Sequence, residues 1–258
     1  MSKENEAVIL SAARTPIGKF QGALSGMNAT NLGAIAVKAA VERAGIDPKE
    51  IEEVLMGNVV QAGNGQAPAR QAAIFAGVPA TVSATAINKV CGSGLKAAMM
   101  SAQAIRAGDA ELFVAGGMES MSRAPYLVSG RMGELKFGNQ QMTDALLNDG
   151  LWDPFENWGM GMAAEFIADE YEVTRAAMDE FALRSQLKAV EAQEAGRFKL
   201  EIVPVQIPGR KGEVTIFDKD EGPRKDSTLE GLAKLKPAFG WFVLVMGIYI
   251  IAKEVFFR

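Results

Sequence analysis

The stretch Asn88-Lys-Val-Cys91-Gly-Ser-Gly94-Leu95 decides the fold and places the one cysteine of the chain between a strand and a helix. Residues 81–90 are β-branched at intervals and predict an extended segment, whereas residues 95–107 predict a helix. The two glycines beside Cys91 permit a tight turn and let a substrate approach the backbone closely. At a helix N-terminus, free N–H groups and the positive end of the helix dipole favour a thiolate.

Local spacing leaves two interpretations of Cys91 open. It is a nucleophile that attacks a thioester carbonyl while neighbouring N–H groups hold the oxyanion, as at a nucleophile elbow. Alternatively, it is a small buried apolar residue, which is the usual state of a lone cysteine. A second glycine turn, Gly116-Gly117, follows another strand candidate, and parallel strands would bring both turns to one edge of the sheet. Glu119, after that turn, is expected to be solvated or to cap the chain.

Strands and helices alternate around this junction. The pattern predicts an α/β fold with a mixed, mostly parallel sheet and helices on both faces. Residues 121–158 are rich in Gly, Met, Asn and aromatic side chains and predict a long excursion from the sheet. The expected strands are 7–12, 54–60, 81–90, 111–115, 202–207 and 214–217, and the expected helices are 67–76, 95–107, one from Thr30 to Gly45, a short one after Asp47-Pro48 and one from Thr174 to about Ala195.

Composition excludes several classes of function. The 258 residues carry 27 basic and 31 acidic side chains, and a net charge of −4 predicts no nucleic-acid partner. The chain has no histidine, so it forms no Ser-His-Asp triad, Cys-His dyad or histidine-ligated metal site by itself, and we expect no metal. A single cysteine and a polar N-terminus indicate a cytoplasmic protein without an export signal.

Several motifs, taken in order, resemble those of the thiolase family over about residues 7–239. The likeness is greatest to bacterial acetyl-CoA acetyltransferases, which join two acetyl-CoA molecules into acetoacetyl-CoA and CoA or run the reverse thiolysis. The motifs are Ser11-Ala-Ala-Arg-Thr-Pro16, Gly63-Asn-Gly-Gln-Ala-Pro-Ala-Arg70, Asn88-Lys-Val-Cys91-Gly-Ser-Gly94, Ala115-Gly-Gly-Met-Glu-Ser-Met-Ser122, Gly196-Arg-Phe-Lys199, Glu201-Ile-Val-Pro204 and Leu232-Ala-Lys-Leu-Lys-Pro-Ala-Phe239.

The resemblance implies the first half of a layered α-β-α-β-α thiolase-like architecture together with a loop domain. Residues 1–120 would form the α/β domain that carries the nucleophile, residues 121–236 the CoA-binding loop domain, and residues 237–258 an atypical tail. Cys91 would carry the acetyl group as a thioester. Coenzyme A and acetyl-CoA would be substrates, and no cofactor would remain bound.

The same resemblance assigns a substrate pocket and an assembly. Leu151 and Met160 would line the thioester pocket, and Arg224 would pack on the adenine, since a guanidinium stacks on a base. Residues 131–142 resemble the loop that joins dimers into tetramers, so a homo-oligomer is expected. Gly159 stands where the family usually has a histidine that shapes the pocket, and this departure changes the expected substrate fit.

After Phe239 the chain departs from the family, which continues with a second domain bearing a water-holding asparagine, a histidine base and a second catalytic cysteine. Residues 237–252 are instead uncharged and mostly apolar. We therefore expect a truncated, catalytically impaired enzyme whose tail arose by a frameshift, a premature stop or a fused end and lowers solubility. The alternative, which we favour less, is a non-catalytic acyl-CoA-binding or interaction module held at a membrane by the tail, although its span of about 24 Å falls short of the ~30 Å needed.

Overall fold

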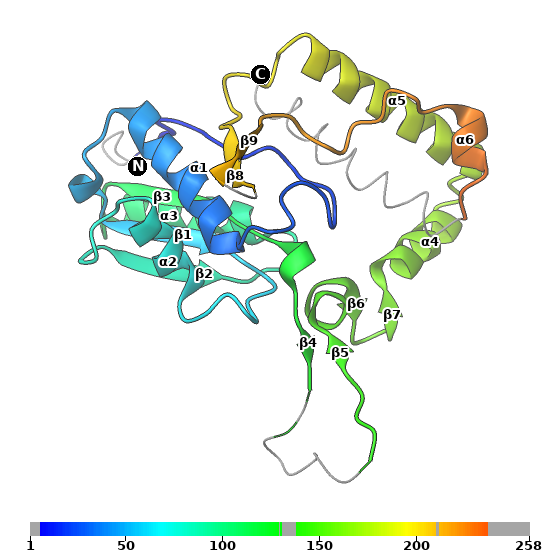
Figure 1. Cartoon of the computed structure of the whole chain (residues 1–258), viewed down its shortest axis with the longest axis horizontal. Coiled ribbons are helices and arrows are strands. Elements are labelled where there is room, and N and C mark those ends of the chain that lie inside the picture. The colour runs from blue at the N-terminus through cyan, green and yellow to red at the C-terminus, as the bar shows by residue number, and fades with distance from the viewer. Residues whose placement is uncertain (1–5, 129, 131–137, 210–211, 237–258) are drawn as a thin grey trace. The chain divides into compact units, whose positions relative to one another are not determined.

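The computed structural model describes residues 6–128, 130, 138–209 and 212–236 (Figure 1). The apolar tail, with every expectation placed on it, lies outside the described residues. The chain divides into two compact units, each treated by itself below: Met1–Gly150 with Glu201–Lys219, and Leu151–Leu200 with Asp220–Arg258. The functional division at residues 120 and 236 is a different partition and stays a prediction.

A parallel sheet is the centre of the first unit. Within the described residues it has three strands in the order β2-β1-β3, formed by Ser83–Ile87, Glu53–Gly57 and Phe113–Gly117. Gly57 pairs with Ile87 on one side and with Gly117 on the other, so all three strands end at the same edge. The prediction of an α/β fold with a mostly parallel sheet is confirmed.

Helices cover both faces of this sheet. The alternation of side chains along β1 sends Val54 and Met56 into a core shared with α1 (Ala29–Ala44) and α2 (Pro68–Phe75). The opposite side of β1, at Gly57, meets the first turn of α3 (Ser93–Ala107). The first unit is therefore an α/β/α sandwich, with α1 and α2 on one face and α3 on the other.

Local capping explains where several helices begin and end. Helix α1 starts after Asn28 rather than at the predicted cap Thr30, which is buried inside the first turn. It ends as predicted at Gly45, whose φ of 68° is a conformation that glycine adopts without strain. The predicted capping box is present, because Asp47 and Glu50 cap each other's backbone around the 3-10 helix Pro48–Glu50.

The strand predicted over residues 7–12 is wrong. Val8, Ile9 and Leu10 are exposed and outside any strand, and the N-terminal segment first pairs at Arg14, which forms a bridge with Ile202. A strand forms only where a neighbour takes its N–H and C=O groups, and among the described residues no strand pairs with this run. The first unit also contains the hairpins β8–β9 (Val205–Pro208 and Val214–Phe217) and β4–β5 (Tyr126–Leu127 and Thr143–Asp144), the 3-10 helix Met121–Arg123 and a π-helical turn that starts at Leu147.

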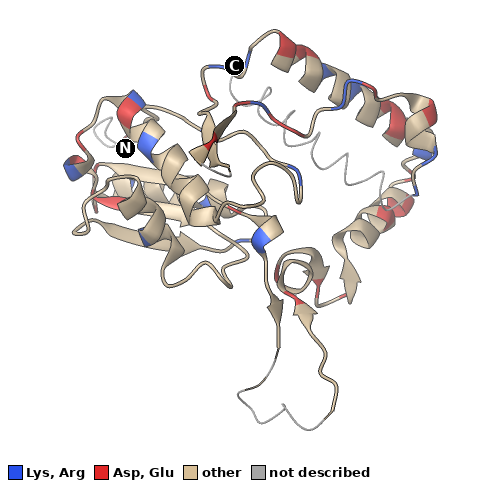
Figure 2. Ribbon diagram, viewed as in Figure 1, with Lys and Arg blue, Asp and Glu red and all other residues tan. Residues whose placement is uncertain are grey.

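The second unit is mainly helical. Helix α5 (Arg175–Glu194) begins at the predicted cap Thr174, whose hydroxyl accepts the N–H of Ala177. Basic and acidic residues are interspersed along this helix (Figure 2), with Arg175, Arg184 and Lys188 among Asp179, Glu180, Glu191 and Glu194. Among the described residues, no helix is long and apolar enough to cross a membrane. The other elements are β6 (Trp152–Asp153), β7 (Trp158–Gly159), α4 (Met160–Glu170) and α6 (Leu229–Ala233).

Candidate active site

Cys91 lies in the turn between β2 and α3, and its side chain is exposed. It is therefore not the buried apolar residue of the second interpretation. The helix begins at Ser93, two residues earlier than predicted, with Gly92 as its N-cap, so Cys91 lies immediately before the first turn. The residue before it, Val90, has a φ of 47°. A β-branched residue rarely adopts this left-handed conformation, so the turn that presents Cys91 is strained.

Side chains on both sides of Cys91 hold this turn. The Ser93 hydroxyl accepts the N–H of Lys89 at 2.8 Å and donates to the Val90 carbonyl at 2.5 Å. The N–H groups of Gly92 and Ser93 donate to the carbonyls of Lys89 and Val90, at 3.0 and 3.1 Å. These two N–H groups are thus already used inside the turn, which removes them from the set of oxyanion donors expected beside the cysteine.

Three glycines let the turn and the sheet approach each other at backbone distance. A Cβ on Gly57 would lie 2.6 Å from the Gly94 nitrogen and 2.7 Å from the Ser93 Cβ. A Cβ on Gly117 would lie 3.5 Å from the Gly94 Cα. The predicted meeting of both glycine sites at one edge of the sheet is confirmed, with Gly116 and Gly117 as the last residues of β3 and not a turn. The first turn of α3 rests directly on the ends of β1 and β3.

Glu119 is a clamp at this edge rather than a solvated residue. Its carboxylate accepts the N–H of Val59 at 2.8 Å, the N–H of Val60 at 3.3 Å and the Asn58 side-chain amide at 2.9 Å. Burial raises the pKa of the Glu119 carboxyl above its ordinary value of 4.5. The hydrogen bonds to the carboxylate lower the pKa, but the effect of burial is larger. Of the two predicted alternatives, solvated or capping, the structure shows the second, because the carboxylate accepts backbone N–H groups.

Asn58 is a residue that the sequence reasoning missed. It is 1% exposed and donates to the Met118 carbonyl at 3.2 Å as well as to Glu119. Its Oδ1 atom is buried and has no hydrogen-bond partner. An asparagine at the end of a hydrophobic strand is the one sequence signal that could have drawn attention to it, since buried amides are normally satisfied.

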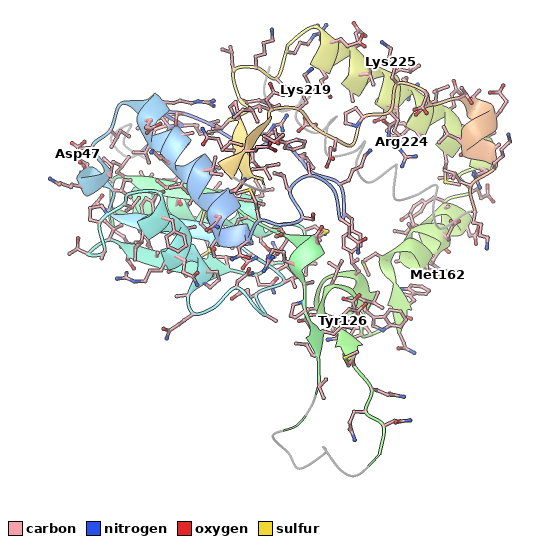
Figure 3. All side chains as sticks on the ribbon, in the orientation of Figure 1. Asp47, Tyr126, Met162, Lys219, Arg224 and Lys225 are labelled. Atoms are coloured by element: carbon pink, nitrogen blue, oxygen red, sulfur yellow. The ribbon has the colours of Figure 1, made fainter. Side chains whose placement is uncertain are left out.

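The second unit brings two of the predicted pocket residues together. Trp152 pairs with Gly159 in the β6–β7 hairpin, so Leu151, which precedes Trp152, and Met160, which follows Gly159, flank the open end of that hairpin. Leu151 is half-buried and Met160 is exposed. Arg224 lies on another segment, beside α5 (Figure 3), where its N–H donates to the Gln186 side chain at 2.8 Å and its side chain is exposed.

Neighbouring residues show how Arg224 is placed. Lys225 binds Glu194 of α5 at 2.8 Å, and this pair raises the pKa of the Lys225 ammonium. The backbone around Arg224 is thus attached to α5 at two points. In the part of the chain that the structure describes, no group of three or more His, Cys, Asp or Glu side chains is arranged to hold a metal ion.

Comparison with known proteins decides the family. Residues 7–241 match the family model described as "Thiolase, N-terminal domain". The chain belongs to the thiolase family. This confirms the resemblance carried by the motifs, and the match extends two residues beyond the predicted end at 239.

The curated relatives of this thiolase chain are longer than the chain itself. It is 54% identical over 234 residues to the "Acetyl-CoA acetyltransferase" of Cupriavidus necator, across 91% of this chain and 60% of that protein. The "Acetyl-CoA acetyltransferase" of Pseudomonas aeruginosa is 52% identical with the same coverage. The "Probable acetyl-CoA acetyltransferase" of Escherichia coli is 49% identical, across 91% of this chain and 59% of that protein. The thiolase chain therefore spans about 60% of the length of these relatives.

Proposed function

We propose that this chain performs the first half of an acetyl-CoA C-acetyltransferase reaction, in which Cys91 receives an acetyl group from acetyl-CoA. The observation that carries the proposal is the strained, glycine-flanked turn that exposes Cys91 at the N-terminus of α3 in a thiolase-family chain. The names of relatives near 50% identity support the substrate class. The exposure of Cys91 leaves its sulfur accessible to a thioester substrate.

The proposed step is a thioester exchange. Cys91 Sγ attacks the acetyl carbonyl carbon, and the bond between that carbon and the CoA sulfur breaks. CoA leaves as its thiol with the proton that Cys91 gave up, and the acetyl group stays on Cys91. The step needs no oxidant and no metal, and each bond formed replaces an equivalent bond broken.

Condensation makes a further demand that these residues do not meet. A base must remove a proton from the methyl group of a second acetyl-CoA. The 258 residues contain no histidine and no second cysteine. We therefore propose that this chain alone accepts the acetyl group and does not complete the synthesis of acetoacetyl-CoA.

We also propose roles for the second unit. Leu151 and Met160 form an apolar wall for the thioester arm, which their places on either side of the paired residues Trp152 and Gly159 support. Arg224 stacks on the adenine, which its exposed side chain and anchored backbone support. The homo-oligomer and the cytoplasmic location stay predictions, and residues 131–137 of the predicted tetramer loop lie outside the described residues.

Incubation with acetyl-CoA tests the proposal directly. We expect intact-mass analysis to find one added acetyl group, which peptide mapping assigns to Cys91 and which is absent from Cys91→Ala. In parallel, iodoacetamide at neutral pH should label native Cys91 faster than Cys91 in the urea-unfolded chain. Labelling at or below the unfolded rate, together with no acetylation, would mean that Cys91 is not a nucleophile and would favour the non-catalytic alternative.

A further inference from the structure

The conformation of Val90 needs support from its surroundings. Its φ of 47° lies in a region that β-branched residues almost never occupy. Such strain persists only where other interactions determine the backbone. Val90 itself is half-exposed, so burial of its side chain does not supply that support.

Two side chains hold the peptide groups on either side of Val90. Asn88 Oδ1 accepts the Val90 N–H at 3.0 Å, which orients the peptide group before Val90. Ser93 Oγ donates to the Val90 carbonyl at 2.5 Å, beside the longer bond of 3.1 Å from the Ser93 backbone N–H, and the two bonds orient the peptide group after Val90. The same Ser93 oxygen accepts the Lys89 N–H at 2.8 Å, so one hydroxyl ties together both arms of the turn.

The position of Ser93 allows it to fix the orientation of the Cys91 side chain. It is 5% exposed, begins α3, and its Cβ lies against Gly57 at the end of β1. The peptide group that Ser93 orients joins Val90 to Cys91, so rotation of that group would swing the Cα–Cβ bond of Cys91. The direction of the thiol thus depends on a bond made two residues further along the chain.

We infer that Ser93 is a positioning residue for Cys91, holding Val90 in its left-handed conformation with the help of Asn88 so that the thiol faces the incoming carbonyl. This inference rests on the proposed function, in which Cys91 is the nucleophile. Ser93 touches no reacting atom and acts through the turn. It fills the role that a supporting shell of hydrogen bonds has around a catalytic group.

The matched control is Ser101, a second buried serine of the same helix. Ser101 is 6% exposed, and its hydroxyl donates only along the helix, to the Ala97 carbonyl at 3.1 Å. The full chain, Ser93→Ala, Asn88→Ala and Ser101→Ala are compared after circular dichroism has confirmed folding. If Ser93→Ala does not fold, Asn88→Ala tests the inference in its place. Asn88 is exposed, and its substitution removes the hydrogen bond that the Val90 N–H makes on the other side of the residue.

The first readout is independent of nucleophilicity. With ¹⁵N-labelled valine, the intraresidue N–H to Hα NOE of Val90 is strong at positive φ and weak at negative φ. We expect this NOE to be strong in the wild-type chain and in Ser101→Ala and to weaken in Ser93→Ala and Asn88→Ala. A strong NOE in both turn variants overturns the inference even if Cys91 proves to be a nucleophile.

The second readout is the rate at which acetyl-CoA acetylates Cys91. We expect Ser93→Ala to lower the maximal rate about tenfold while the half-saturating acetyl-CoA concentration stays unchanged, because a misdirected thiol loses orientation and not substrate binding. In a Val90→Gly background, where positive φ is unstrained, the loss should shrink to about twofold. If Ser93→Ala lowers the maximal acetylation rate equally in both backgrounds, Ser93 does not act through Val90, and the inference is overturned. If no chain is acetylated, the proposed function is refuted instead.

Discussion

The Asn58 side-chain amide donates to the Glu119 carboxylate across 2.9 Å, joining residues that follow the ends of β1 and β3. The same carboxylate takes the N–H groups of Val59 and Val60. The clamp lies at the edge of the sheet on which the turn of Cys91 rests. It holds a carboxyl group that burial makes harder to ionise.

Glu119→Gln should change how stability depends on pH. The folded state raises the pKa of Glu119 above 4.5. The protonated carboxyl group therefore contributes to folding stability in full below pH 4.5, and this contribution is lost as the pH rises through the raised pKa. In Glu119→Gln this loss disappears, so the unfolding free energy of the variant relative to wild type should increase with pH across that window. Urea denaturation at a series of pH values measures it.

Glu52→Gln is the matched control with the opposite sign. The N–H groups of Glu111 and Leu112 lower the pKa of Glu52, so its contribution is present above pH 4.5 and is lost as pH falls. The unfolding free energy of this variant relative to wild type should therefore decrease as pH rises. Parallel slopes for the two variants would contradict the assignment for Glu119.

Gly57→Ala should destabilise the chain by about 1–3 kcal/mol, since the new methyl group would meet backbone atoms that have little room to move. The Gly94 nitrogen would be 2.6 Å away and the Ser93 carbonyl carbon 2.7 Å away. Displacement of α3 should also slow acetylation of Cys91. Gly26→Ala is the control, because nothing lies within 4 Å of its Cβ position and its stability should change by no more than about 1 kcal/mol.

Glu201→Gln should cost about 1 kcal/mol in unfolding free energy. Arg14 Nε binds Glu201 Oε1 at 2.7 Å, with side chains 21% and 24% exposed, and ties the N-terminal segment to residues before β8. The Lys38–Glu42 pair, at 3.9 Å and mostly exposed, provides the comparison, and Glu42→Gln should change stability by less than about 0.5 kcal/mol. Chemical denaturation that ranks the two variants in the reverse order would refute this.

The purified chain should not cleave acetoacetyl-CoA with added coenzyme A, because no histidine or second cysteine serves the proton transfers. Loss of the enolate absorbance of acetoacetyl-CoA is the measurement, with Cys91→Ala as the background. Turnover that disappears in Cys91→Ala would reveal a base of another chemical type in this chain.

Periodicity and capping made the elements around the sheet predictable. Gly45 and Thr174 sit where the sequence pattern put them, because a left-handed C-cap and a hydroxyl N-cap are set by residues next to one another. The strand predicted over residues 7–12 is absent because its formation depends on distant residues. Its apolar composition predicts a strand, but strand formation depends on a partner that local sequence does not reveal.

The candidate site was predictable in part. The glycines around Cys91 indicated a tight turn, and the resemblance to thiolases led to the prediction that Cys91 is the nucleophile. The strain at Val90 and the bonds of Ser93 were not foreseen, because side-chain orientation in a turn depends on packing against Gly57, a residue distant in sequence. Asn58 and Glu119 were missed or misread for the same reason.

Gly57, Gly94 and Gly117 meet where two strands and a helix converge, and each already has the smallest side chain available. A substitution in an ordinary core can be offset when a neighbour shrinks. Here the closest atoms include the Gly94 nitrogen and the Ser93 carbonyl carbon, which belong to the backbone, so no substitution at Gly94 or Gly117 makes room for a methyl group at Gly57. Substitutions that alter the surroundings of Cys91 should therefore be tolerated in the neighbouring loops, and directed-evolution libraries that vary the three glycines should yield few folded variants.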